Sequence, residues 1–138
     1  VEGVSIKLGA TDAKQAVAGG STGDMEERNY AIGYTFGQFS VGAHKRTYDD
    51  GGTSSATNDF ENTSYGVTYA VNDGLSLGLQ YGEASEGDDT VDEETTAFSV
   101  GYSLGGMGFE ITYSQTDNIG AVSGDDGEAI QVRTKAKF

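Results

Sequence analysis

The chain has 138 residues, a formal net charge of −14 and no cysteine, and these values exclude several classes of protein. Without cysteine there is no disulfide framework, metal–thiolate site or thiol nucleophile, and so acidic a chain lacks the basic surface that nucleic-acid binding requires. No apolar run reaches the roughly 18 to 20 residues of a membrane-spanning helix, and a mean hydropathy of −0.43 is compatible with strands that are apolar on one face only.

Apolar residues alternate with small or polar ones along the chain, which is the period of a β-strand with one apolar face. In chain order the alternation predicts eight strands of about ten residues, the length of a tilted transmembrane strand, over 2–11, 26–37, 38–48, 62–71, 75–84, 95–104, 107–115 and 128–138. In the first four, the apolar set is Val4, Ile6, Leu8, Ala10; Tyr30, Ile32, Tyr34, Phe36; Phe39, Val41, Ala43; and Tyr65, Val67, Tyr69, Val71. In the last four it is Leu75, Leu77, Leu79, Tyr81; Phe98, Val100, Tyr102, Leu104; Met107, Phe109, Ile111, Tyr113; and Ile130, Val132, Thr134, Ala136, Phe138.

The connections between these strands alternate between short and long. Tight-turn residues join every second pair of neighbouring strands. They are Gly37-Gln38, Asn72-Asp73-Gly74 and Gly105-Gly106. The remaining connections, from Thr11 to Met25, Asp49 to Glu61, Glu83 to Glu93 and Gln115 to Gly127, are long, acidic and rich in small residues. Short turns on one rim and long loops on the other are typical of an outer-membrane β-barrel, with the short turns in the periplasm.

The aromatic residues sort into two bands on the predicted outer face. Phe36, Phe39, Tyr69, Tyr102, Phe109 and Phe138 lie near the short-turn rim, and Tyr30, Tyr65, Tyr81, Phe98 and Tyr113 lie near the long-loop rim. Two aromatic bands are expected at the two interfaces of a membrane. The competing interpretation is a soluble β-sandwich that buries these rings in its core, which gives no reason for two bands.

The last predicted strand, Ala129 to Phe138, alternates apolar residues and ends on an aromatic. With the turns at Tyr34 to Gly37 and Tyr102 to Gly106, it resembles the C-terminal strands of Gram-negative general porins, particularly the alphaproteobacterial type, although Ala136 stands where many members carry a second aromatic. The resemblance implies an outer-membrane channel for passive diffusion of ions and small hydrophilic solutes. It also implies a homotrimer, contact with outer-membrane lipid and lipopolysaccharide, and recognition of Phe138 by the barrel-assembly machinery.

Such porins have about sixteen strands, so the resemblance implies that residues 1–138 form the C-terminal half of a transmembrane antiparallel up-and-down β-barrel. The alternative is a complete eight-stranded barrel with an adhesive, structural or lipid-contact role. An eight-stranded barrel must fill its interior with side chains. The predicted inward positions are mostly glycine, alanine, serine and threonine, and therefore favour a wider barrel.

The larger inward residues are the candidate site. Parity turns Lys7, His44, Arg46, Glu110, Arg133 and Lys135 toward the lumen, where Lys7, Arg46, Arg133 and Lys135 would form a basic wall that sets ion preference. His44 is the only histidine, and no Ser and Asp spacing around it suggests a triad, so an enzyme is not expected.

The long loops carry paired carboxylates. Oxygen-rich clusters of this kind can contact divalent cations, and Ca²⁺ at the loops is the only cofactor that the sequence suggests. The competing interpretation is a solvated acidic surface. The candidate residues are Asp49, Asp50, Asp88, Asp89, Asp125 and Asp126.

Overall fold

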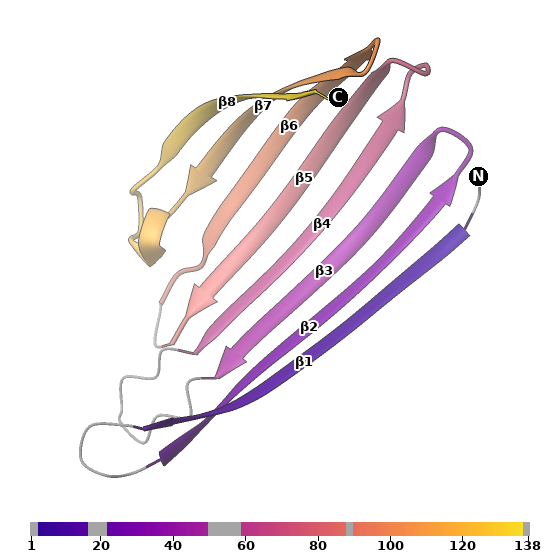
Figure 1. The fold of residues 1–138 in the computed structure, drawn as a ribbon. Helices are drawn as coiled ribbons and strands as arrows, with labels where there is room; N and C mark the ends of the chain where they lie inside the picture. The colour runs from indigo at the N-terminus through magenta and orange to yellow at the C-terminus, as the bar shows by residue number, and fades with distance from the viewer. Residues whose placement is uncertain (1–2, 17–21, 50–58, 88–89, 137–138) are drawn as a thin grey trace.

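The structure, a computed structural model, describes residues 3–16, 22–49, 59–87 and 90–136. Eight β-strands form one sheet in chain order, each antiparallel to the next (Figure 1). They are β1 (Gly3–Ala16), β2 (Thr22–Phe36), β3 (Phe39–Asp49), β4 (Phe60–Ala70), β5 (Leu75–Glu86), β6 (Glu93–Leu104), β7 (Met107–Asp117) and β8 (Gly127–Ala136). The predicted all-β class of eight antiparallel up-and-down strands is confirmed.

The three tight turns lie at one end of the sheet (Figure 1). Gly37 has a φ of 55°, and Gly105 and Gly106 have φ of 55° and 86°, the left-handed backbone that glycine adopts most readily in hairpins. In the turn between β4 and β5, Asn72 Oδ1 accepts hydrogen bonds from the backbone N–H groups of Gly74 and Leu75, both at 2.9 Å. Local turn chemistry therefore fixes the register of each of these hairpins.

The strands extend further than predicted at the opposite end. The expectation of a loop from Thr11 to Met25 was wrong at both of its ends, because β1 continues to Ala16 and β2 begins at Thr22, with these two residues paired. Beyond Ala10 the residues no longer alternate apolar with polar, so the sequence signal disappears although the hydrogen-bonded ladder continues. The one helical element of the described residues is a single 3-10 turn, η1 (Ile119–Ala121). In this part of the chain no helix is long and apolar enough to cross a membrane.

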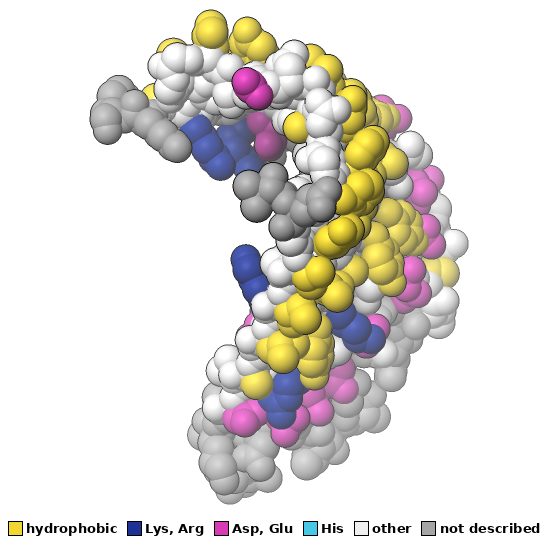
Figure 2. All heavy atoms as spheres, turned by 90° about the vertical axis from the view of Figure 1, so that its right-hand side faces the viewer, with side chains coloured by type: hydrophobic (Ala, Val, Ile, Leu, Met, Phe, Trp, Pro, Cys, Tyr) yellow, Lys and Arg dark blue, Asp and Glu magenta, His cyan; other side chains and the backbone are white. Residues whose placement is uncertain are grey.

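The apolar side chains occupy the convex face of the curved sheet, and some of the Lys and Arg side chains lie inside the curve (Figure 2). No described residue is buried, and Leu8, Ile130 and Val132 are 75%, 74% and 66% exposed. A soluble sandwich would bury these side chains in a core. The described strands have no such core, so their apolar sets face outward as predicted.

The band of aromatics near the short turns forms a contact series across strands. The Phe36 and Phe39 rings lie 5.5 Å apart, and Phe39 lies 4.7 Å from Tyr69. These separations suit offset aromatic packing. The series holds three neighbouring strands together at the level where the apolar face ends.

The sheet is open. β1 and β8 are its two edges, and among the described residues neither pairs with the other. Each edge therefore presents backbone N–H and C=O groups that no strand of the described chain satisfies.

Candidate functional site

The concave face is a thin wall of small and polar side chains. Small residues face one another across strands, as Gly78 faces Ser99 and Gly101 faces Ser76. A Cβ at Gly78 would lie 2.5 Å from Ser99 Oγ, and one at Gly101 would lie 2.7 Å from Ser76 Oγ. A side chain at either glycine would have to displace the facing serine hydroxyl, and with glycine the pair takes up little of the space inside the curve.

Four basic side chains of the concave face correspond to the predicted basic wall. Lys7 lies on β1, Arg46 on β3, and Arg133 and Lys135 on β8. Three of the four therefore lie on the two edge strands of the sheet. Their role in a pore stays a prediction.

Arg46 is held in an ion pair near the end of β3. Its Nε lies 3.1 Å from Glu27 Oε1 on β2, and Asn29 Nδ2 donates to the same oxygen at 2.8 Å. Glu27 precedes Tyr30 by three residues, on the long-loop side of the apolar band and outside it. The hydrogen bond from Asn29 lowers the pKa of Glu27, and the positive charge of Arg46 acts in the same direction.

Arg133 of β8 also forms an ion pair, with Glu110, the residue directly opposite it on β7. Its Nη1 lies 3.6 Å from Glu110 Oε1, and its Nη2 donates to Gln131 Oε1 at 3.2 Å. These residues line a hollow of about 340 Å³ on the concave face, together with Gln80, Ser99 and Thr112. The hollow is polar and open, as a water-filled surface requires.

Lys7 and Lys135 differ from the two arginines, because neither has a carboxylate partner among the described residues. The concave face described here also carries four carboxylates, Glu27, Glu86, Glu93 and Glu110, against the four bases. The described wall is therefore mixed in charge where the sequence suggested a mainly basic one. Among the described residues of this face, the basic side chains without a carboxylate partner are Lys7 and Lys135.

His44 lies between Ala31 and Ser64 in the register of β2, β3 and β4. No carboxylate of the described concave face is in register with it. A serine hydrolase needs an acid that orients the histidine. The arrangement suits a polar wall residue.

The sequence analysis missed several aromatic and acidic side chains of the concave face. Two are aromatic, Tyr48 and Phe60, and three are acidic, Glu27, Glu86 and Glu93. They lie where β2 to β6 continue beyond the apolar band. Parity within the predicted strands 26–37 and 38–48 would have found Glu27 and Tyr48, and extending the parity of the next three strands by two residues would have found Phe60, Glu86 and Glu93.

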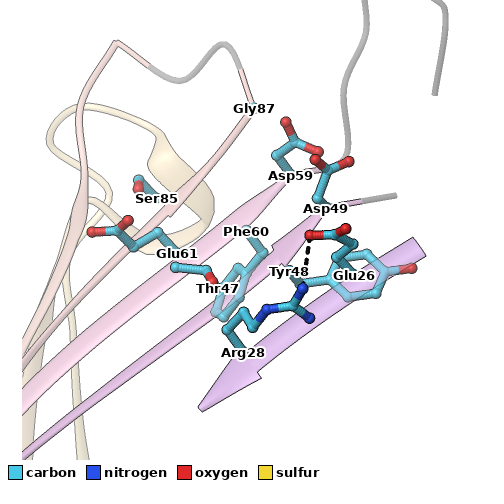
Figure 3. Close-up of a pocket in the computed structure, with 10 residues that line it drawn as sticks. All are labelled: Glu26, Arg28, Thr47, Tyr48, Asp49, Asp59, Phe60, Glu61, Ser85 and Gly87. Atoms are coloured by element: carbon cyan, nitrogen blue, oxygen red, sulfur yellow. Dashed lines mark hydrogen bonds and ion pairs between the residues drawn. The ribbon is translucent and has the colours of Figure 1, made fainter. Parts of the chain in front are cut away.

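The outer ends of the strands carry ion pairs on the convex face as well. Arg28 pairs with Asp12 at 2.7 Å and with Glu26 at 3.1 Å, and Lys45 pairs with Glu61 at 2.6 Å. Figure 3 shows the hollow of about 370 Å³ at the ends of β2, β3 and β4, with the Arg28–Glu26 pair dashed. Residues of both faces line it, Tyr48 and Phe60 among them, so it lies across the rim of the sheet.

The acidic pairs proposed for divalent cations fall partly outside the described residues, which exclude Asp50, Asp88 and Asp89. Asp49 ends β3. Asp125 and Asp126 help to close their own loop, because the Asp125 carbonyl accepts from Ile119 N at 2.6 Å and Asp126 Oδ1 from Asn118 N at 3.2 Å. Within the described ranges no group of three His, Cys, Asp or Glu residues could hold a metal ion. The proposed assembly signal, Phe138, also lies outside the described residues.

Comparison with known proteins identifies a family. A family model described as Gram-negative porin matches residues 2–118, from the first strand to the end of β7. No curated protein and no solved structure matches the chain significantly.

Proposed function

Because the chain belongs to the Gram-negative porins, a family of the bacterial outer membrane, we propose that it forms one wall of a water-filled channel for passive diffusion of ions and small hydrophilic solutes. The observation that carries the proposal is the division of one sheet into an apolar convex face and a hydrophilic concave face (Figure 2). A wall of this kind places lipid outside and water inside.

The open edges bear on the size of the barrel. In a membrane no water is available to satisfy the unpaired groups of an edge strand, so a spanning sheet must close. We propose that strands supplied by other residues pair with β1 and β8, giving a barrel of about sixteen strands. Both the open sheet and the small concave residues support this over a complete eight-stranded barrel, whose narrow interior would have to be filled.

The remaining functional expectations stay proposals. They are a homotrimer, contact with outer-membrane lipid and lipopolysaccharide, recognition of Phe138 during assembly by the barrel-assembly machinery, and weak Ca²⁺ contacts at the acidic loops. Porins are channels, and no catalytic role is proposed for this chain.

The absence of cysteine from these 138 residues offers a sharp test. Ala97 and Phe98 are neighbours on β6, but Ala97 belongs to the concave face and Phe98, 46% exposed, to the convex face. The variants A97C and F98C of the intact protein would be reconstituted in planar bilayers and treated with a charged, membrane-impermeant thiol reagent.

The proposal predicts conducting channels in both variants and a stepwise loss of current only in A97C, because only the thiol introduced by A97C would face water inside the pore. A protein that inserts without conducting would contradict the channel. Equal modification of both variants would contradict the assignment of the two faces.

A further inference from the structure

The polar hollow of about 340 Å³ lies within the concave face, at the height of the apolar band. Glu110 of β7 and Arg133 of β8, which are opposite each other in the register, line one side of it. Gly66, Gly78 and Ala97 line it from β4, β5 and β6, and because they have little or no side chain the wall is recessed there. The hollow therefore joins an open space to a pair of opposite charges.

Glu110 and Arg133 satisfy little of each other's hydrogen-bonding capacity. The distance of 3.6 Å between Glu110 Oε1 and Arg133 Nη1 is too long for a hydrogen bond. Within the described residues, the side-chain hydrogen bond of this pair is the one that Arg133 Nη2 donates to Gln131 Oε1, at 3.2 Å. A guanidinium has five N–H donors and a carboxylate about four acceptor positions, and the two side chains are 51% and 46% exposed. Most of their donors and acceptors are therefore available to a solute.

The row beside this pair adds neutral polar groups. Ser99 of β6 is in register with Thr112 of β7, and Thr112 with Gln131 of β8. All three line the hollow, and Gln80 of β5 lines it as well. Their hydroxyl and amide groups can both donate and accept. Two full charges thus border a strip of groups that suit an uncharged polar substituent.

We propose that this hollow is a binding subsite for zwitterionic α-amino acids. Arg133 donates to the α-carboxylate and Glu110 accepts from the α-ammonium group, while a polar side chain reaches toward Ser99 and Thr112. In an α-amino acid the nitrogen and the carboxyl carbon are about 2.5 Å apart, because both are bonded to one carbon. Charges so close together can meet both members of a pair that is itself 3.6 Å apart. The inference deepens the proposed channel function and rests on it.

A zwitterion fits this pair better than a simple anion or cation does. Glu110 and Arg133 cancel in net charge, so an ion attracted by one of them is repelled by the other, 3.6 Å away. A zwitterion places an opposite charge beside each of them, and the four charges alternate in sign. Because both side chains are about half exposed, water weakens each contact. Weak binding suits a channel, from which the solute must also leave.

The test is a titration of salt conductance with L-alanine, for the intact protein in planar bilayers. L-Alanine adds no net charge, so its binding in the hollow should lower the conductance to a plateau as the subsite fills. Lactamide is the matched solute, because it has the same number of non-hydrogen atoms and neither charge. We expect no saturable decrease of the conductance with lactamide.

Three variants locate the effect. E110Q/R133Q removes both charged partners without changing the net charge, and it should raise the half-effect concentration of L-alanine by at least on the order of tenfold, the effect of losing one charge-assisted hydrogen bond. A97L, which fills the hollow and leaves both charges in place, should raise it too. The matched control is E27Q/R46Q, which neutralises the other Arg–Glu pair of the concave face and should keep the original half-effect concentration.

The outcomes separate the two proposals. Absence of salt conductance from the intact protein would contradict the channel itself. Normal conductance that L-alanine and lactamide lower equally, or an L-alanine effect that neither E110Q/R133Q nor A97L weakens, would overturn the amino-acid subsite and leave the channel intact. A loss of the effect in E27Q/R46Q as large as that in E110Q/R133Q would equally overturn it, because the charge of the wall in general, and not this hollow, would then hold the solute.

Discussion

The two faces of this sheet are built by the same strands and differ in almost every chemical property. On β7, Ile111 and Tyr113 face outward and are 52% and 40% exposed, while the alternate residues Glu110 and Thr112 line the polar hollow of the concave face. The convex face tolerates large apolar residues because a lipid solvent surrounds it, and the concave face requires small and polar ones. The comparison shows that this protein is organised by two solvents and not by a core.

The largest expected effect comes from placing a charge on the wrong face. Ile111 lies midway between Phe109 and Tyr113, which belong to the two aromatic bands. The variant I111K should lower the free energy of unfolding by about 2–4 kcal/mol, the cost of a lysine at the bilayer midplane. The adjacent T112K, on the concave face, should change it by less than about 1 kcal/mol, because water solvates that side.

Urea unfolding of both variants in lipid vesicles measures this difference. Equal destabilisation by I111K and T112K would mean that the two faces do not meet different solvents.

A second prediction compares lysines of the two faces by their effect on ion preference. The double variant K7Q/K135Q removes the two concave charges that have no carboxylate partner among the described residues, so the reversal potential in a salt gradient should move toward cation preference. Lys45 lies on the convex face, paired with Glu61 at 2.6 Å, and K45Q should leave the reversal potential unchanged. A shift in K45Q as large as that in K7Q/K135Q would remove the distinction.

A third and smaller effect concerns the pair of Arg133 and Glu110. The variants R133Q and E110Q should shift the reversal potential in opposite directions, because each leaves one uncompensated charge 3.6 Å from the site of the other. The double variant R133Q/E110Q should return close to the original value. A reversal potential of the double variant far from the original value in planar bilayers would show that the two side chains do not act on the same part of the wall.

The smallest effect is a pH dependence at the outer end of the concave face. The Asn29 hydrogen bond lowers the pKa of Glu27, so Glu27 stays ionised and paired with Arg46 as the pH falls through the ordinary glutamate range, and its contribution to stability is lost only when the pH falls through the lowered value. In N29A this loss should begin at higher pH. Thermal unfolding of both proteins between about pH 6 and pH 3, around the ordinary glutamate value of about 4.3, would reveal the displacement. Superimposable pH profiles would contradict it.

Much of the fold could be read from the sequence because the strand period is local. Apolar residues at every second position between Val4 and Ala10, or between Met107 and Tyr113, reveal the lipid face without knowledge of any partner strand. The glycine and asparagine turns follow from backbone preference in the same way. The period is lost where both faces meet water, and for this reason the β1–β2 extension to Ala16 and Thr22 was expected to be a loop.

The sequence by itself thus determined the class of fold, the direction in which each side chain of the apolar band points, and which lysines, arginines and histidine lie on the concave face. Only the tertiary structure decided which of those charges are compensated, because Arg46 meets Glu27 from a neighbouring strand and Arg133 meets Glu110 across another hairpin. It also brought Glu27, Tyr48, Phe60 and Glu86 into one row. Strand register couples residues that lie far apart in the chain, and this coupling is invisible to a pattern that repeats every two residues.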